Sequence, residues 1–165
     1  MSFEIEGIEQ IKLKLQRLND VPQIADEELK KCAEDLADKA RAMAPVDYGD
    51  LKEAIQVARR GAQGAGGRFV KGISNYEVLI NNRHPVSDPF KQKYGTDYVG
   101  EYAWYVHEHM GWGSNSADLM PSDKSIAAGA AAGVEAGGKF LERALEDMRD
   151  EIGMRLAQAV RKHIK

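Results

Sequence analysis

The sequence predicts an α+β fold in which an antiparallel sheet is packed on one face by helices from the N-terminal part and by a long C-terminal helix. Apolar residues recur at helical spacing near both ends of the chain, whereas the middle is rich in β-branched and aromatic residues interrupted by glycine and proline. At 165 residues the chain is about the size of one domain. We therefore expect a single domain over residues 1–165, with long loops at about 81–97 and 113–138.

Two helices are predicted before residue 45. The first is a short amphipathic helix that ends at Asn19–Asp20, and the second begins at Val21–Pro22, because proline is tolerated in a first helical turn. Pro45 ends the second helix, since the residue before a proline is pushed out of helical geometry. Their apolar stripes comprise Ile8, Ile11, Leu15 and Leu18, and then Ile24, Leu29, Cys32, Leu36, Ala40 and Met43.

The middle of the chain predicts strands. The segment 51–59 ends in a strand, and the segments 69–74 and 76–80 are strand-like. The glycine-rich segment 61–67 connects them as a flexible hairpin tip. Residues 98–107 are rich in aromatic and β-branched residues, which predicts a further strand with alternating faces.

The last third predicts a loop and then the longest helix. From Gly111 to Gly138 the composition shifts to glycine, alanine and serine, so we expect a loop ordered by a partner, with a short helix at 125–132. From Phe140 onward apolar residues recur at helical spacing, and acidic residues precede basic ones, as the helix dipole favours. We expect the stripe of this helix to be buried, and it comprises Leu141, Leu145, Met148, Ile152 and Leu156.

Composition excludes several classes of protein. The net charge of −3 lacks the strong basic excess of a dedicated nucleic-acid binder, and no apolar run reaches the ~18 residues of a membrane span. Cys32 is the only cysteine, so neither an intrachain disulfide nor a cysteine zinc cluster is expected. The segment 1–6 carries acid where a signal peptide needs base, so we expect a protein that is made in a cytosol, is not exported by such a signal and does not contact a membrane.

Catalytic and cofactor motifs are weak. On a strand, His107 and His109 share one face and with Glu108 form a candidate metal site, but their spacing differs from that of the zinc-protease helix motif. The segment 61–67 lacks the Gly-Lys-Ser/Thr ending of a phosphate-binding loop. We therefore expect no enzyme, no cofactor and no resident metal, and a metal-dependent hydrolase at the two histidines is the least favoured alternative.

Four basic residues flank the glycine-rich tip: Arg59, Arg60, Arg68 and Lys71. Two partners fit them, an acidic protein neighbour or the phosphates of DNA. The acidic balance of the whole chain favours the protein partner slightly. A nucleic-acid-binding accessory protein is the alternative function.

Three segments in this order resemble the family of phage neck proteins that complete the tail or join it to the head. Residues 44–55, Ala-Pro-Val-Asp-Tyr-Gly-Asp-Leu-Lys-Glu-Ala-Ile, are similar to the family's Ala-Pro-Val-Asp-Thr-Gly-x-Leu-x-x-Ser-Ile. Residues 102–108, Tyr-Ala-Trp-Tyr-Val-His-Glu, are similar to Tyr-Ala-x-Tyr-Val-Glu-x-Gly. Residues 139–145, Lys-Phe-Leu-Glu-Arg-Ala-Leu, resemble Pro-Phe-Leu-x-Pro-Ala-Leu.

The resemblance implies a structural component of the virion neck or tail that is assembled in the bacterial cytoplasm and acts as a homo-oligomeric ring. Its implied partners are other connector, neck or tail proteins, and the DNA that the basic residues could contact would be packaged DNA. The chain departs from the family pattern at Tyr48, Ala54, Lys139 and Arg143. These departures leave open which place in the phage neck the protein occupies. Nine residues match the family's motifs, and the resemblance implies a structural role for each of them: Pro45, Asp47, Gly49, Leu51, Tyr102, Ala103, Tyr105, Phe140 and Leu141.

Overall fold

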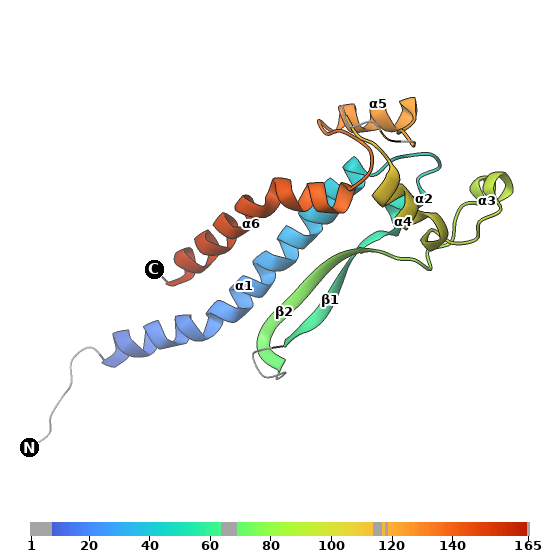
Figure 1. The fold of residues 1–165 in the computed structure, drawn as a ribbon. Helices are drawn as coiled ribbons and strands as arrows, with labels where there is room; N and C mark the ends of the chain where they lie inside the picture. Colours follow the sequence, from blue (N-terminus) through green and yellow to red (C-terminus); the bar gives the residue numbers. More distant parts are fainter. Residues whose placement is uncertain (1–7, 64–68, 114–116, 118, 165) are drawn as a thin grey trace, which may run out of the picture. The chain divides into compact units, whose positions relative to one another are not determined.

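A computed structural model describes residues 8–63, 69–113, 117 and 119–164 (Figure 1). The consecutive strands pair as one antiparallel hairpin, and helices precede and follow it. The predicted α+β fold with a long C-terminal helix is confirmed. In chain order the elements are α1 (Ile8–Met43), α2 (Asp50–Ala54), β1 (Ile55–Gln63), β2 (Phe69–Ile80), α3 (Asp88–Tyr94), α4 (Gly100–His109), α5 (Asp123–Ala131) and α6 (Phe140–Ile164).

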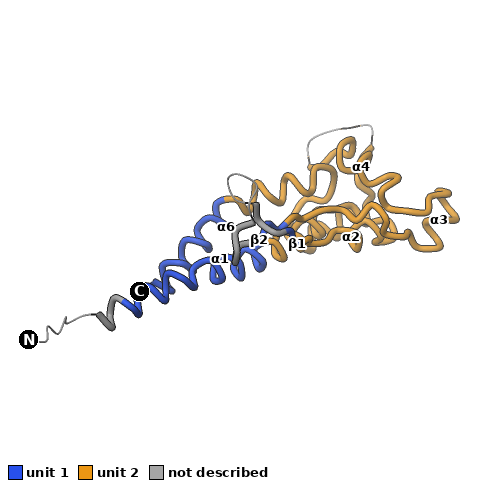
Figure 2. The backbone as a smooth tube through the Cα atoms, turned by 90° about the horizontal axis from the view of Figure 1, so that it is seen from below, with its two compact units in different colours: residues 1–32, 59–76, 150–165 blue, residues 33–58, 77–149 orange. Residues whose placement is uncertain are grey.

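The chain divides into two compact units (Figure 2). Unit 1 comprises residues 1–32, 59–76 and 150–165, and unit 2 comprises residues 33–58 and 77–149. The helices α1 and α6 and the hairpin each contribute residues to both units. The single domain expected from the sequence stays a prediction.

Unit 2 has a hydrophobic core in which small side chains of α1 meet the start of α6. The alanines of α1 recur every three or four residues and so share one face of the helix. Phe140 at the start of α6 is completely buried in this core, and an ion pair of 3.0 Å between Lys39 and Asp147 also joins the two helices. The core comprises Ala37, Ala40, Met43, Ala44, Leu51, Ala54, Ile55, Val99, Ala103, Phe140 and Ala144.

Unit 1 is joined by polar contacts. Asp26 of α1 is buried, and its carboxylate accepts hydrogen bonds from the backbone N–H of Ser74 at 2.7 Å, from Arg59 at 3.0 Å and from the Tyr76 hydroxyl at 3.2 Å. These three partners lie on β1 and β2, so one carboxylate fixes the hairpin to α1 within this unit.

The two predicted N-terminal helices are one helix, and the predicted end at Asn19–Asp20 is wrong. Pro22 lies inside α1, where it removes one backbone hydrogen bond. The residues from 12 to 20 are all exposed, so water can bond to the carbonyl that loses its partner. The predicted end before Pro45 is confirmed, because α1 ends at Met43.

The strand predicted at 98–107 is wrong, because residues 100–109 form α4. Aromatic and β-branched residues favour strands only weakly, and burial decides between the alternatives. Ala103 and His107, four residues apart, are both buried, which is the spacing of a helix face. The strand-like segments 69–74 and 76–80 are parts of one strand, β2.

The buried face of α6 also differs from the prediction. Leu145 is 50% exposed, whereas Ala144 and Met148 are buried. The helix is therefore turned by about one residue, or roughly 100°, from the orientation that the leucine stripe predicted. A small alanine next to α1 lets the two helices pack more closely than a leucine would.

Both predicted loops contain helices. The segment 81–97 contains α3, and the short helix predicted at 125–132 is confirmed as α5. Ser125, Gly129 and the segment 136–138 are buried in unit 2. These residues therefore pack within the isolated chain, although we expected a partner to order them.

Candidate functional site

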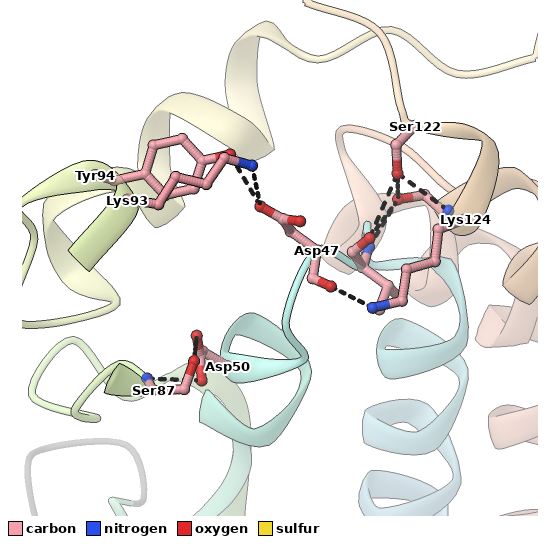
Figure 3. Close-up of polar contacts among 9 residues, drawn as sticks. Asp47, Asp50, Ser87, Lys93, Tyr94, Ser122 and Lys124 are labelled. Atoms are coloured by element: carbon pink, nitrogen blue, oxygen red, sulfur yellow. Dashed lines mark hydrogen bonds and ion pairs between the residues drawn. The ribbon is translucent and has the colours of Figure 1, made fainter. Parts of the chain in front are cut away.

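The motif loop, residues 45–51, follows α1 and is fixed by local geometry. Gly49 precedes α2 with φ of +106°, a conformation that side chains with a Cβ rarely adopt. The buried Asp50 carboxylate accepts hydrogen bonds from the backbone N–H and the hydroxyl of Ser87, both at 3.0 Å (Figure 3). The loop is thereby tied to the segment that precedes α3.

Asp47 lies between two other segments of unit 2, as Figure 3 shows. Its side chain accepts a hydrogen bond of 3.0 Å from the Tyr94 hydroxyl and lies 3.7 Å from the Lys93 ammonium, both on α3. Its backbone carbonyl accepts a hydrogen bond from Lys124 of α5. The hydrogen bond to Tyr94, together with the Asp47 charge, raises the pKa of Lys93.

The N-terminus of α5 holds the loop from its other side. The buried Ser125 hydroxyl accepts a hydrogen bond of 2.8 Å from the backbone N–H of Val46 and lies 3.1 Å from the carbonyl of the same residue. Ser122 caps α5 by accepting a bond from the Ser125 N–H at 3.3 Å. The glycine- and alanine-rich segment therefore supports the motif loop.

A concave pocket of about 600 Å³ opens beside this loop. One side is aromatic, and Phe90 stacks on Tyr102 at 4.8 Å between ring centroids. Burial, with the charges of Asp50 and Asp47, raises the pKa of the Tyr102 phenol well above its usual range, so it stays protonated. The lining residues are Pro45, Val46, Asp47, Tyr48, Gly49, Asp50, Leu51, Phe90, Lys93, Tyr94, Thr96, Tyr102, Val106, Met110, Leu119, Met120, Ser122 and Ser125.

The family-motif residues are divided between this pocket and the core. Pro45, Asp47, Gly49, Leu51 and Tyr102 line the pocket. Ala103, Phe140 and Leu141 belong to the core or pack against it, and Tyr105 is exposed. The pocket also contains residues that the sequence did not indicate, and they lie in or beside segments expected to be loops: Phe90, Lys93, Tyr94, Met120 and Ser125. An i, i+4 aromatic pair at 90 and 94 is the signal that could have indicated α3.

Two of the four basic candidates, Arg59 and Arg60, have side chains among the residues that the structure describes. Arg59 donates to Asp26 and also to the Ser74 hydroxyl at 2.7 Å, while its side chain is 66% exposed. Arg60 is its neighbour on β1, and successive strand residues point to opposite faces. Arg68 and the side chain of Lys71 lie outside the described residues, as does most of the glycine-rich tip. Their contact with DNA or protein stays a prediction.

The histidine pair has a different geometry from the one that a metal site needs. On α4, His107 and His109 are two residues apart and so point in directions about 200° apart. His107 is buried with its Nδ1 2.8 Å from Glu108, and His109 stacks on Tyr105. Within the described part of the chain, no group of three or more His, Cys, Asp or Glu side chains is arranged to hold a metal ion.

Comparison with known families matches residues 9–106 to the family described as "Bacteriophage HK97-gp10, putative tail-component". The match covers more than half of the chain and includes α1, the hairpin, the motif loop and most of α4. The chain belongs to this HK97-gp10-like family of structural bacteriophage tail components. Searches of curated proteins and of solved structures found no match.

Proposed function

We propose that this tail component is a neck subunit that completes the tail or joins it to the head, and that it acts as a homo-oligomer in the virion. The observation that carries the proposal is the pocket. Five residues of the neck-protein motifs line it, although the motifs lie some fifty residues apart in the sequence. An aromatic and aliphatic pocket with a few polar groups at its rim suits the binding of a protein segment.

Exposed apolar side chains support an oligomeric subunit. Leu13, Leu15 and Leu18 of α1 are each slightly more than half exposed, and elsewhere in the chain Met154 is 58% and Trp104 67% exposed. Large apolar side chains grouped on a surface indicate contacts with other proteins. No helix in the described ranges is long and apolar enough to cross a membrane.

Removal of this chain from its phage is expected to leave filled heads and tails that do not join, because the neck would lack one of its layers. Electron microscopy of the lysate and the titre of infectious particles measure the effect. Wild-type protein supplied from a plasmid should restore joined particles. Joined and infectious particles without the chain would contradict the proposal.

DNA contact through the hairpin remains the second candidate, and it predicts a salt-dependent affinity for duplex DNA. Each phosphate neutralised contributes about −0.9 to the slope of log affinity against log salt. If the hairpin binds DNA, changing Arg59, Arg60, Arg68 and Lys71 to serine should flatten this slope. The matched control changes Lys30, Lys31, Arg149 and Lys162, four exposed helical cations, to serine. A wild-type protein with no measurable DNA affinity at low salt would rule this candidate out.

A further inference from the structure

The pocket of unit 2 has an aromatic wall, which we define as Tyr48, Phe90, Tyr94 and Tyr102. The buried Phe90 contacts all three tyrosine rings, with centroids between 4.6 and 5.8 Å from its own. Tyr48 and Tyr94 are 42% and 51% exposed, so a ligand can reach their rings. The face of an aromatic ring carries partial negative charge, and it therefore attracts a cation.

One cation of the chain itself already lies against this wall. The Lys93 ammonium is 4.7 Å from the ring centroid of Tyr94 and 5.7 Å from that of Tyr48, within the ~6 Å of a cation–π interaction. It also lies 3.7 Å from Oδ2 of Asp47, the oxygen that accepts a hydrogen bond from Tyr94 (Figure 3). The Lys93 side chain is 52% exposed, and an ion pair this long and this exposed is weak. A cation that fits the wall better can therefore displace it.

The charged groups that line the pocket also favour a cationic ligand. Two carboxylates, Asp47 and Asp50, stand against one ammonium, Lys93, while Lys124 bonds to the Asp47 carbonyl from outside the lining. Asp50 is buried and bonded to Ser87, whereas the Asp47 side chain is 49% exposed. Both side-chain contacts of Asp47 within the described ranges involve Oδ2, so Oδ1 can accept a hydrogen bond from a partner.

We infer that the pocket receives an arginine side chain from a segment of another neck or tail protein, and that this arginine takes the place of Lys93. A guanidinium is planar, so it can stack on the aromatic wall and donate two parallel hydrogen bonds to one carboxylate, in a fork geometry that an ammonium lacks. The volume of about 600 Å³ leaves room for apolar residues beside the arginine, and Leu119 and Met120 line the pocket where such residues can pack. The inference rests on the proposed function and names the chemistry of the partner.

The test measures the affinity of the full chain for two short synthetic peptides by NMR titration. The first peptide carries an arginine between two leucines, and in the second the arginine is replaced by citrulline, its uncharged analogue. The arginine peptide should bind at least about fivefold more tightly, because only its side chain gains the charge interactions with the pocket. The amide signals of the motif loop and of α3 should shift on binding.

Two variants should change the affinity for the arginine peptide in opposite directions. Lys93→Gln removes the competing cation and should tighten binding about two- to fivefold, whereas Asp47→Asn removes the carboxylate charge and should weaken binding by a similar factor. Asp47→Asn keeps an oxygen that can accept from Tyr94, and unchanged thermal midpoints show that both variants are folded. Lys91→Gln and Asp88→Asn, at exposed positions of α3 outside the pocket lining, are the matched controls and should bind like the wild type.

The signs of these changes separate arginine from other occupants. If the pocket takes an acidic segment, both signs reverse, and if it takes an apolar segment, the arginine and citrulline peptides bind equally well. Either result, or no binding of the arginine peptide at millimolar concentration, would overturn the inference. The neck role is judged by a different measurement, the loss of joined particles when the chain is absent, so the two proposals can fail separately.

Discussion

Replacing Phe140 with alanine is expected to lower the free energy of unfolding of unit 2 by about 3–5 kcal/mol. The side chain is completely buried, belongs to the core cluster and packs edge-on against His107 at 4.8 Å between ring centroids. The neighbours on α1 are mostly alanines, which cannot extend into the space that the ring leaves. The change therefore creates a cavity as well as a loss of buried apolar surface.

Leu145→Ala is the matched control for this prediction, because it removes a large apolar side chain from the same helix. Leu145 is half exposed, so its loss should cost less than about 1 kcal/mol. Chemical denaturation followed by tryptophan fluorescence measures both variants, since the two tryptophans, Trp104 and Trp112, both lie in unit 2. Equal destabilisation by the two variants would show that the buried face of α6 is the leucine stripe.

Replacing Asp26 with alanine is expected to destabilise unit 1 by about 2–4 kcal/mol. The change leaves the buried N–H of Ser74 without its acceptor and removes the acceptor of the Tyr76 hydroxyl. The charge pair with Arg59 adds less than a fully buried pair would, because the arginine is well exposed to water. The hairpin should then separate from α1 more often, and hydrogen exchange at the amide of Ser74 measures this.

Two controls separate the role of Asp26 from a general loss of charge on α1. Asp38→Ala removes an exposed acid that pairs only one turn away with Arg41, so it should change the free energy of unfolding by less than about 0.5 kcal/mol. Asp26→Asn keeps an oxygen that can accept from Ser74 and should be intermediate. If Asp26→Ala and Asp38→Ala have the same effect, the buried carboxylate does not hold the hairpin.

The same carboxylate gives unit 1 a defined acid sensitivity. Burial alone would raise the pKa of Asp26, but the hydrogen bonds from Ser74 and Tyr76, together with the Arg59 charge, lower it below the ordinary value of 3.8. A lowered pKa contributes stability that is complete above the unfolded pKa and is lost as pH falls through the folded pKa. The difference in stability between the wild type and Asp26→Asn should therefore be constant near neutral pH and shrink below about pH 4.

The features that could be predicted from the sequence are those that depend on neighbouring residues. Pro45 ends α1, because a proline constrains the residue before it regardless of the rest of the fold. The strands β1 and β2 form where the strand-like segments predicted them, although residues 61–63 of the glycine-rich segment belong to β1, and α6 follows the apolar repeat that begins at Phe140. Local geometry and spacing are sufficient for such elements, since each is set by residues within a few positions of one another.

The features that depend on distant residues could not be predicted, because they follow from packing between segments. The segment 98–107 contains both alternating aromatic residues and an i, i+4 pair at Ala103 and His107, and burial of that pair favours the helix. The orientation of α6 was decided in the same way, because α1 offers a small-residue surface that Ala144 fits and Leu145 does not.

The pocket is the clearest case of dependence on the tertiary structure. The sequence identified the motif loop, but the walls of the pocket come from α3, α4 and the segment that leads into α5. Hydrogen bonds between the loop and Ser87, Tyr94 and Ser125 span 37, 47 and 79 residues of chain. The secondary-structure propensity of a segment carries no information about contacts at such separations. These hydrogen bonds stabilise the loop only after the core has brought the distant segments together.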